Sequence, residues 1–74
     1  MLGAVTPNGA AIRSIREARG LSLRQLAHLI ERNPGYCSRL ETGGRGARPK
    51  TLYRIAQELN VPLAAITRET PRVQ

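Results

Sequence analysis

The chain has 74 residues, which is enough for one small domain and too few for two. Its single cysteine excludes an internal disulfide or a cysteine-based zinc cluster, and no apolar run approaches the ~20 residues that span a bilayer, so we expect a soluble cytoplasmic protein. Twelve Lys and Arg against five Asp and Glu give a net charge of +7, which is typical of proteins that bind a polyanion. A GC-rich genome would also produce an arginine-rich chain without selection for any ligand.

The first predicted element is a helix near the N-terminus. Thr6-Pro7 is a capping residue followed by a first-position proline. Ile12, Ile15 and Ala18 then form the apolar stripe of a helix that Gly20 ends.

Two further helices follow in quick succession. Ser22 caps the second, whose apolar residues recur at i, i+3, i+4 and i+7: Leu23, Leu26, Ala27 and Ile30. Asn33-Pro34 starts the third, in which Cys37 and Leu40 face inward until Gly43 ends it. Only residues 31–33 separate the two helices, so they must cross steeply, as in a helix-turn-helix.

A basic, glycine-rich loop (43–48) leads into the last two predicted helices. Pro49 opens the fourth, which carries apolar residues at the same helical spacing: Leu52, Ile55, Ala56 and Leu59. A fifth, short helical turn follows Val61-Pro62 and holds Leu63 and Ile66.

The predicted fold is therefore all-α, a compact bundle of five helices with tight connections. No segment alternates with period two, so no strand is predicted. We assign residues 1–9 to an N-terminal arm and the start of helix 1, residues 10–67 to the helix-turn-helix domain, and residues 68–74 to a flexible tail.

Two stretches are specific enough to indicate a family: "IREARGLSLRQLAHLI" (15–30) and "GYCSRLETGGRGARPKTLYRIAQELNVPLAAI" (35–66). Together they resemble the Xre/Cro/phage-repressor type of helix-turn-helix domain over about residues 10 to 67. The resemblance implies a lambda-repressor-like bundle of prokaryotic or phage origin that acts in transcription regulation. It also implies that the third helix lies in the DNA major groove while the second crosses the backbone.

Three residues depart from the family pattern. Glu31 stands where the turn usually has glycine, so it must either adopt a positive φ or be avoided by a longer second helix. Arg32 replaces a buried aliphatic residue, and Leu23 replaces a glutamine that often contacts phosphate.

Arg39 is the main candidate for reading bases. On the exposed face of the third helix its guanidinium can reach guanine O6 and N7, although an ion pair with Glu31 or Glu41 is the alternative. The further candidates for base contact are Ser38, Thr42, Asn33, Pro34 and Gly35. Plain solvation, helix capping and helix initiation are the simpler explanations of these five.

Six residues are candidates for DNA phosphate contact: Arg24, Arg32, Tyr36, Arg45, Arg48 and Lys50. Arg48 occupies a cap position without a capping side chain, which a phosphate contact would explain. Tyr36 has the alternative of packing against the second helix. The resemblance also implies that Arg16 and Glu41 form a structural pair.

We expect double-stranded DNA as the partner and a location at the nucleoid through it. A weak homodimer through Val61, Leu63, Ile66 and the tail would suit a pseudo-palindromic site. No catalytic constellation is visible, and His28 is a lone histidine, so we expect no enzyme, cofactor or metal. The alternatives are an antitoxin-like or adaptor module that binds a protein partner, and non-specific binding of nucleic acid driven by charge.

Overall fold

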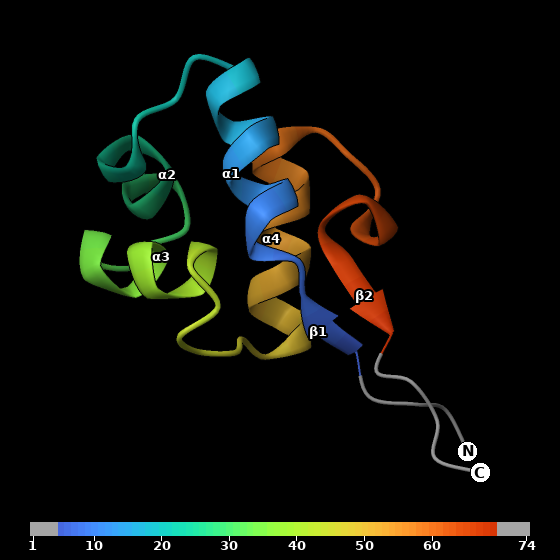
Figure 1. Ribbon diagram of the computed structural model, residues 1–74. Helices are drawn as coiled ribbons and strands as arrows, with labels where there is room; N and C mark the ends of the chain where they lie inside the picture. Colours follow the sequence, from blue (N-terminus) through green and yellow to red (C-terminus); the bar gives the residue numbers. More distant parts are fainter. Residues whose placement is uncertain (1–4, 70–74) are drawn as a thin grey trace, which may run out of the picture.

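In the computed structural model, which describes residues 5–69, the chain folds into helices that follow one another between two short strands (Figure 1). The elements in chain order are β1 (Val5–Pro7), α1 (Gly9–Ala18), α2 (Leu23–Leu29), α3 (Pro34–Glu41), α4 (Pro49–Leu59), the 3-10 helix η1 (Leu63–Ile66) and β2 (Thr67–Glu69). Helices α2 and α3 stack on one side of the α1–α4 pair, and the strands lie at the opposite side. Among the described helices, none is long and apolar enough to cross a membrane.

The prediction of five α-helices is wrong in its last member. The segment after Pro62 makes a single 3-10 turn, closed by a hydrogen bond from the Ala65 N–H to the Pro62 carbonyl (2.9 Å). At Thr67 the backbone becomes extended and enters β2. A helix is thus cut short because the chain is drawn into a strand pairing.

The two strands form a small antiparallel ribbon that was not predicted. Val5 pairs with Glu69, Thr6 with Arg68 and Pro7 with Thr67. The Thr6 hydroxyl also donates to the Arg68 carbonyl (3.1 Å). Strands of three residues are too short to show a period-two pattern. Arg68 and Glu69 therefore belong to the ribbon rather than to the predicted flexible tail, of which residues 70–74 lie outside the described part.

The first helix begins two residues later than predicted. Thr6 and Pro7 lie in β1, and Asn8 caps α1 by accepting a hydrogen bond from the Ala11 N–H (3.2 Å). The Asn8 N–H donates to the Ile66 carbonyl (2.8 Å), which ties the start of α1 to the end of η1. Strand pairing takes the residues that the local sequence would place at the cap.

The apolar core lies where the four α-helices and η1 meet. Its most deeply buried side chains are Ile12, Leu26, Cys37, Leu40, Leu52, Ile55, Leu59 and Ile66. Of the predicted first stripe, Ile12 is buried, Ile15 is half-buried and Ala18 is exposed. The complete burial of Ile66 contradicts its predicted place on a dimer surface, whereas Val61 and Leu63 are half-buried at the edge of the core.

Each of the four α-helices ends in the same way. A residue with left-handed backbone follows the last turn, and the next N–H donates to the carbonyl five residues back. The left-handed residues are Gly20, Glu31, Gly43 and Asn60. These ends allow tight connections, such as residues 30–33 between α2 and α3.

Candidate nucleic-acid interface

Local capping explains why the segment after Asn33 is helical although few of its residues are apolar. The Asn33 side chain accepts from the Tyr36 N–H (2.7 Å), and Pro34 fills the first helical position. At the other end the Thr42 hydroxyl donates to the Ser38 carbonyl (3.1 Å). Cys37 and Leu40 anchor α3 in the core, as predicted.

The opposite side of α3 is exposed over its whole length. It carries all the predicted base-reading residues: Asn33, Pro34, Gly35, Ser38, Arg39 and Thr42. Two of them also stabilise the helix, because the Asn33 side chain caps its start and the Thr42 hydroxyl donates its proton to a backbone carbonyl. Ser38, Arg39 and the amide N–H groups of Asn33 keep unused donors on this face.

Arg39 makes no ion pair with any described carboxylate, in contrast to the alternative considered from the sequence. A Cβ on residue 35 would lie 3.6 and 3.9 Å from the Arg39 Nη1 and Nη2 atoms. The guanidinium therefore lies back over the first turn of α3, across the glycine. That turn is the end of a recognition helix that contacts base edges in helix-turn-helix proteins.

Of the two solutions open to Glu31, the chain adopts the positive φ, at 58°. The Glu31 N–H donates to the His28 carbonyl (3.1 Å) and the Arg32 N–H to the Ala27 carbonyl (2.9 Å). Glu31 thus occupies the left-handed position of a helix end that glycine fills after α1 and α3. The turn keeps its geometry without its usual glycine.

Arg16 and Glu41 form the predicted structural pair, which fixes α3 to α1. The Arg16 Nε and Nη2 atoms donate to the two Glu41 carboxylate oxygens (2.7 and 3.0 Å), and Nη1 donates to the Leu21 carbonyl (2.8 Å). Both side chains are buried, and the hydrogen bond to Glu41 raises the pKa of Arg16. The Glu41 carboxylate is therefore paired inside the protein and does not neutralise the positive charge on the exposed face of α3.

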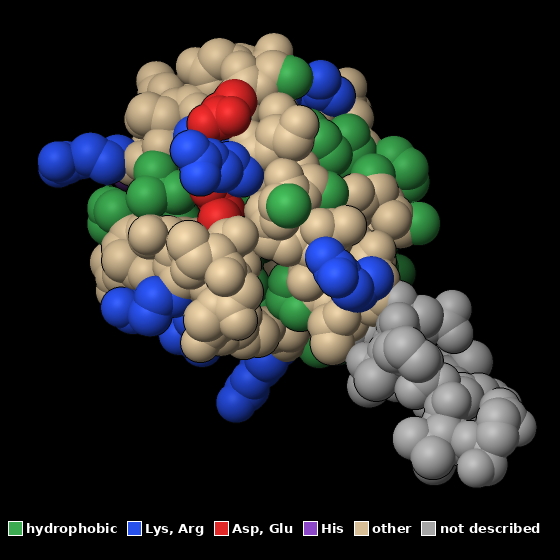
Figure 2. All heavy atoms as spheres, in the orientation of Figure 1, with side chains coloured by type: hydrophobic (Ala, Val, Ile, Leu, Met, Phe, Trp, Pro, Cys, Tyr) green, Lys and Arg blue, Asp and Glu red, His purple; other side chains and the backbone are tan. Residues whose placement is uncertain are grey.

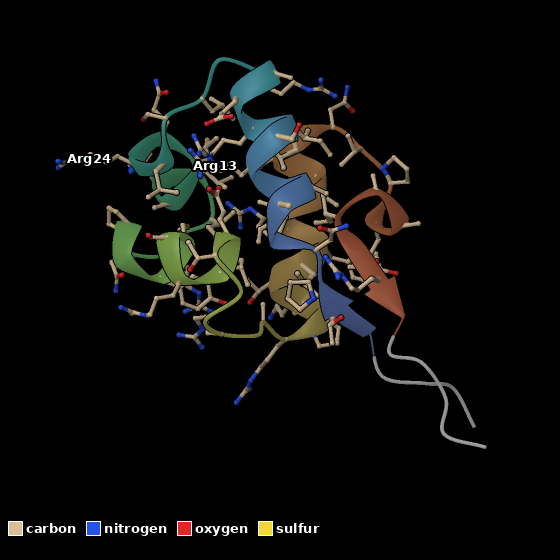
Figure 3. All side chains as sticks on the ribbon, in the orientation of Figure 1. Arg13 and Arg24 are labelled. Carbon is tan, nitrogen blue, oxygen red and sulfur yellow. The ribbon has the colours of Figure 1, made fainter. Side chains whose placement is uncertain are left out.

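The other two ion pairs among residues 5–69 lie away from α3. Arg13 pairs with Glu17 within α1, and Arg54 pairs with Glu58 within α4. In Figure 2 the acidic side chains gather beside a basic one near the centre of the view, while other basic side chains stand at the outer edge of α2, below α3 and at the right of the molecule. Arg24 projects outward from α2 (Figure 3). Ion pairing thus leaves six of the eight unpaired described cations on α2, α3 and the residues that flank α3, with Arg19 and Arg68 elsewhere.

The predicted phosphate-contacting cations are all exposed: Arg24, Arg32, Arg45, Arg48 and Lys50. None of them pairs with a carboxylate in the described part of the chain. Arg48 sits at the cap position of α4 without a capping hydrogen bond, as the sequence indicated. Leu23, at the position where relatives often have a glutamine, packs against the edge of the core.

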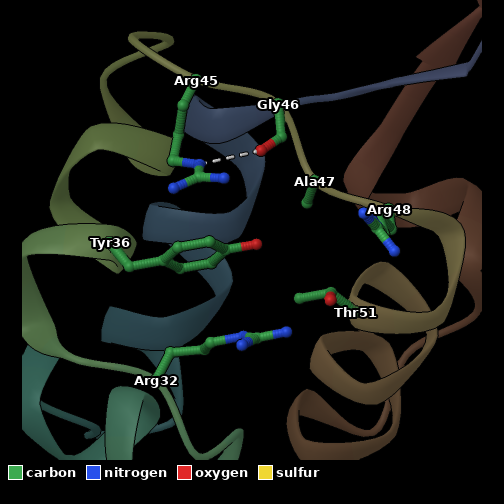
Figure 4. Close-up of a pocket in the computed structure, with 7 residues that line it drawn as sticks. All are labelled: Arg32, Tyr36, Arg45, Gly46, Ala47, Arg48 and Thr51. Atoms are coloured by element: carbon green, nitrogen blue, oxygen red, sulfur yellow. Dashed lines mark hydrogen bonds between the residues drawn. The ribbon is translucent and has the colours of Figure 1, made fainter.

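Tyr36 differs from the other candidates because its side chain is largely buried, only 9% exposed. Its ring lies between two guanidinium groups, 4.1 Å from that of Arg45 and 5.4 Å from that of Arg32 (Figure 4). Tyr36 is therefore packed, as the alternative interpretation expected, and its ring also holds two cations in place. Periodicity could not reveal this contact, because Arg45 comes from the glycine-rich loop.

Three residues that position the interface carry no sequence pattern that pointed to them. Arg54 donates to the Leu29 carbonyl (2.8 Å) and Arg19 to the Leu59 carbonyl (3.0 Å), which satisfies the ends of α2 and α4 from neighbouring helices. Gly9 is buried, and its backbone lies directly against the Leu40 and Glu41 carbonyls.

Comparisons with known proteins agree with this geometry. The helix-turn-helix family HTH_3 matches residues 12–66. No match is found among curated protein sequences. The structure is similar to that of the clp gene regulator ClgR from Corynebacterium glutamicum, with 38% identity and a TM-score of 0.73 over 76% of this chain and 60% of that chain. This chain therefore spans less than two thirds of that ClgR chain.

Two further solved structures share the fold. The restriction-modification controller protein C.AhdI from Aeromonas hydrophila is 28% identical, with a TM-score of 0.74 over 77% of this chain and 86% of that chain. PlcR from Bacillus thuringiensis, solved in complex with the peptide PapR7 and DNA, is 33% identical, with a TM-score of 0.71 over 78% of this chain and 20% of that chain.

Proposed function

The chain belongs to the Xre-type helix-turn-helix family of DNA-binding transcription regulators, and from that premise we propose that it recognises a specific double-stranded DNA sequence with α3 in the major groove. The observation that carries the proposal is the division of charge. Three carboxylates are paired with arginines within α1, within α4 and on the buried side of α3, while the exposed side of α3 and its flanks keep unpaired cations.

Affinity and specificity fall to different residues. Arg24, Arg32, Arg45, Arg48 and Lys50 neutralise phosphates, which supplies sequence-independent and salt-dependent binding. Arg39 reads a guanine through O6 and N7, with Ser38 beside it. Asn33 contributes through its free amide N–H donors, Thr42 through its hydroxyl oxygen as an acceptor, and Pro34 and Gly35 through close approach of the helix backbone to the bases.

One copy of this small domain reads few base pairs, so we propose that two copies bind a pseudo-palindromic site. Their recognition helices would then lie about 34 Å apart, one turn of DNA. With Ile66 in the core, the dimer surface is left to the half-buried Val61 and Leu63 and to residues beyond Glu69. Such a surface is small, so dimerisation is weak in solution and is reinforced on DNA. PlcR was solved with DNA bound, which supports DNA as the ligand of this helix arrangement.

Selection from a randomised duplex pool tests the proposal. Wild type is expected to recover a consensus, and Arg39→Ala to lose the preference at one position at a cost of about 1–3 kcal/mol. Arg24→Ala is expected to keep the consensus and to lower the salt slope by about one unit. Arg13→Ala is the matched control, because it removes the same charge from α1, where the arginine is paired with Glu17.

The same selection separates the two alternatives. Binding without a consensus, with a steep salt slope that Arg39→Ala leaves unchanged, would mean that charge alone drives association. Absence of DNA binding at low salt would favour the antitoxin-like or adaptor module. The observation behind that module is that Pro34 and Gly35 offer no side-chain hydrogen bond at the start of α3.

A further inference from the structure

A basic pocket lies between α3, the loop that follows it and the first turn of α4 (Figure 4). Its volume is about 550 Å³, within the range of small-molecule sites. Its lining residues are Arg32, Tyr36, Arg45, Gly46, Ala47, Arg48 and Thr51. Three of these are arginines and none is acidic, so the pocket favours an anion.

Two of the three guanidinium groups are held in position before any ligand arrives. The Tyr36 ring separates Arg32 from Arg45, and the Arg45 Nε also donates to the Gly46 carbonyl (3.1 Å). Stacking on an aromatic ring restricts a side chain that would otherwise lose conformational freedom on binding. The pocket is therefore preorganised, unlike a cation that projects freely into solvent such as Arg24.

The Tyr36 hydroxyl adds a hydrogen-bond donor to the pocket. Most of Tyr36 is buried, but its hydroxyl points into the pocket and is not among the buried polar atoms, so it is free to donate to a ligand there. Arg48 on the far wall has no cap bond and no ion pair within residues 5–69. The donors of both side chains converge on the same space.

We propose that this pocket binds the terminal phosphate of a small phosphorylated molecule. A terminal phosphate carries close to two negative charges and presents three free oxygens. A DNA phosphodiester carries one charge and two free oxygens. Three guanidinium groups and a phenol hydroxyl match the terminal phosphate better, in charge and in the number of acceptors. This inference goes beyond DNA recognition, because the pocket would be filled in the absence of DNA.

A ligand in this pocket would affect DNA binding, and this consequence rests on the proposed function. Arg32, Arg45 and Arg48 are the cations that we assign to DNA phosphates. A small phosphorylated molecule in the pocket therefore competes with the DNA backbone for the same guanidinium groups. Occupancy is expected to lower DNA affinity and so to act as a signal.

Titration of the DNA-free protein with pyrophosphate, followed by amide NMR shifts at constant ionic strength, tests the site. Wild type is expected to bind one pyrophosphate with shifts around Tyr36 and residues 45–51, and dimethyl phosphate, a diester, to bind about tenfold more weakly. Arg48→Ala should weaken pyrophosphate binding about tenfold. Tyr36→Phe keeps the ring stack and removes the hydroxyl, and should weaken it about three- to tenfold.

Arg24→Ala is the matched control, since it removes one exposed arginine outside the pocket. If it weakens pyrophosphate binding as much as Arg48→Ala does, diffuse charge explains the binding and the site is refuted. Equal affinity for dimethyl phosphate also refutes the site, because the pocket would then bind a phosphodiester of the DNA backbone as well as a terminal phosphate. Arg48 is exposed, so its variant decides the question even if Tyr36→Phe does not fold. Because no DNA is present, failure of DNA recognition leaves this result unaffected.

Discussion

Glu31 and Cys37 show how single residues set the properties of the helix-turn-helix. Glu31 holds a left-handed backbone at the turn, and Cys37 fixes the middle of α3 in the core. Neither side chain faces the DNA-binding side as a ligand. Their effects are therefore expected in stability rather than in recognition.

Replacement of Glu31 by glycine is predicted to stabilise the protein. A non-glycine residue at φ 58° carries a steric cost of about 1–2 kcal/mol, which glycine avoids. Glycine also gives the unfolded chain more conformational freedom, and this offsets part of the gain. A net gain of up to about 1 kcal/mol raises the unfolding midpoint by about 4–8 °C. Calorimetry measures it, with Asn60→Gly as the control, because asparagine tolerates this conformation and should gain less. A lower midpoint for Glu31→Gly would refute strain at the turn.

The burial of Cys37 predicts a loss of stability at alkaline pH. Burial raises the pKa of the Cys37 thiol, because the thiolate is poorly solvated in the core. Its contribution is fully present below the unfolded-state pKa of 9.0 and is lost as pH rises through the higher folded-state pKa. Within that window wild type should lose up to about 1.4 kcal/mol per pH unit relative to Cys37→Ala. Urea titrations of both proteins from pH ~7 to ~10 measure the difference in slope, and parallel slopes would contradict it.

At the scale of elements, the position of α3 depends on α1. The Arg16–Glu41 pair joins the two helices at one point, and the close backbone approach of Gly9 joins them at another. The Asn8 N–H and the β1–β2 ribbon hold the start of α1 in turn. The ribbon therefore acts on the recognition helix indirectly, through the packing of α1.

Replacement of Gly9 by alanine is predicted to destabilise the fold. A Cβ at this position would overlap the backbone oxygens of Leu40 and Glu41, which cannot move without shifting the end of α3. We expect a loss of about 3 kcal/mol in the free energy of unfolding. Gly46→Ala is the matched control, because no atom lies within 4 Å of its Cβ position, and its effect should stay within about 0.5 kcal/mol. Similar stabilities for the two variants would show that α1 and α3 do not meet at Gly9.

Local sequence patterns predicted the four α-helices and the short turn between α2 and α3, because capping and apolar spacing act within a few residues, but they misplaced the start of α1 and predicted an α-helix at η1. Asn33 and Ser22 cap where expected, and Leu26 and Leu40 are buried at the crossing. Contacts between distant segments were missed. The ribbon needs both ends of the described chain, and the stack on Tyr36 needs an arginine from a glycine-rich loop.

At the scale of the whole molecule, charge and fold are arranged together. Three ion pairs use acidic side chains on α1, α4 and the inner side of α3. Of the eight described cations outside these pairs, six lie on α2, in the turn before α3, on the outer side of α3, in the loop and at the start of α4, and the other two are Arg19 and Arg68. One side of a small protein thereby carries most of its net charge, as a DNA-binding surface requires.

Amide NMR shifts of the labelled protein on addition of its selected duplex test this account most directly. We predict that the largest shifts fall in residues 33–50, with smaller ones at the start of α2 around Arg24, and that β1, β2 and η1 stay nearly unchanged. The same experiment with a scrambled duplex should give weaker shifts at Arg39 and Ser38. Shifts centred on the ribbon or on η1, or equal shifts with both duplexes at Arg39, would contradict recognition of DNA sequence by α3.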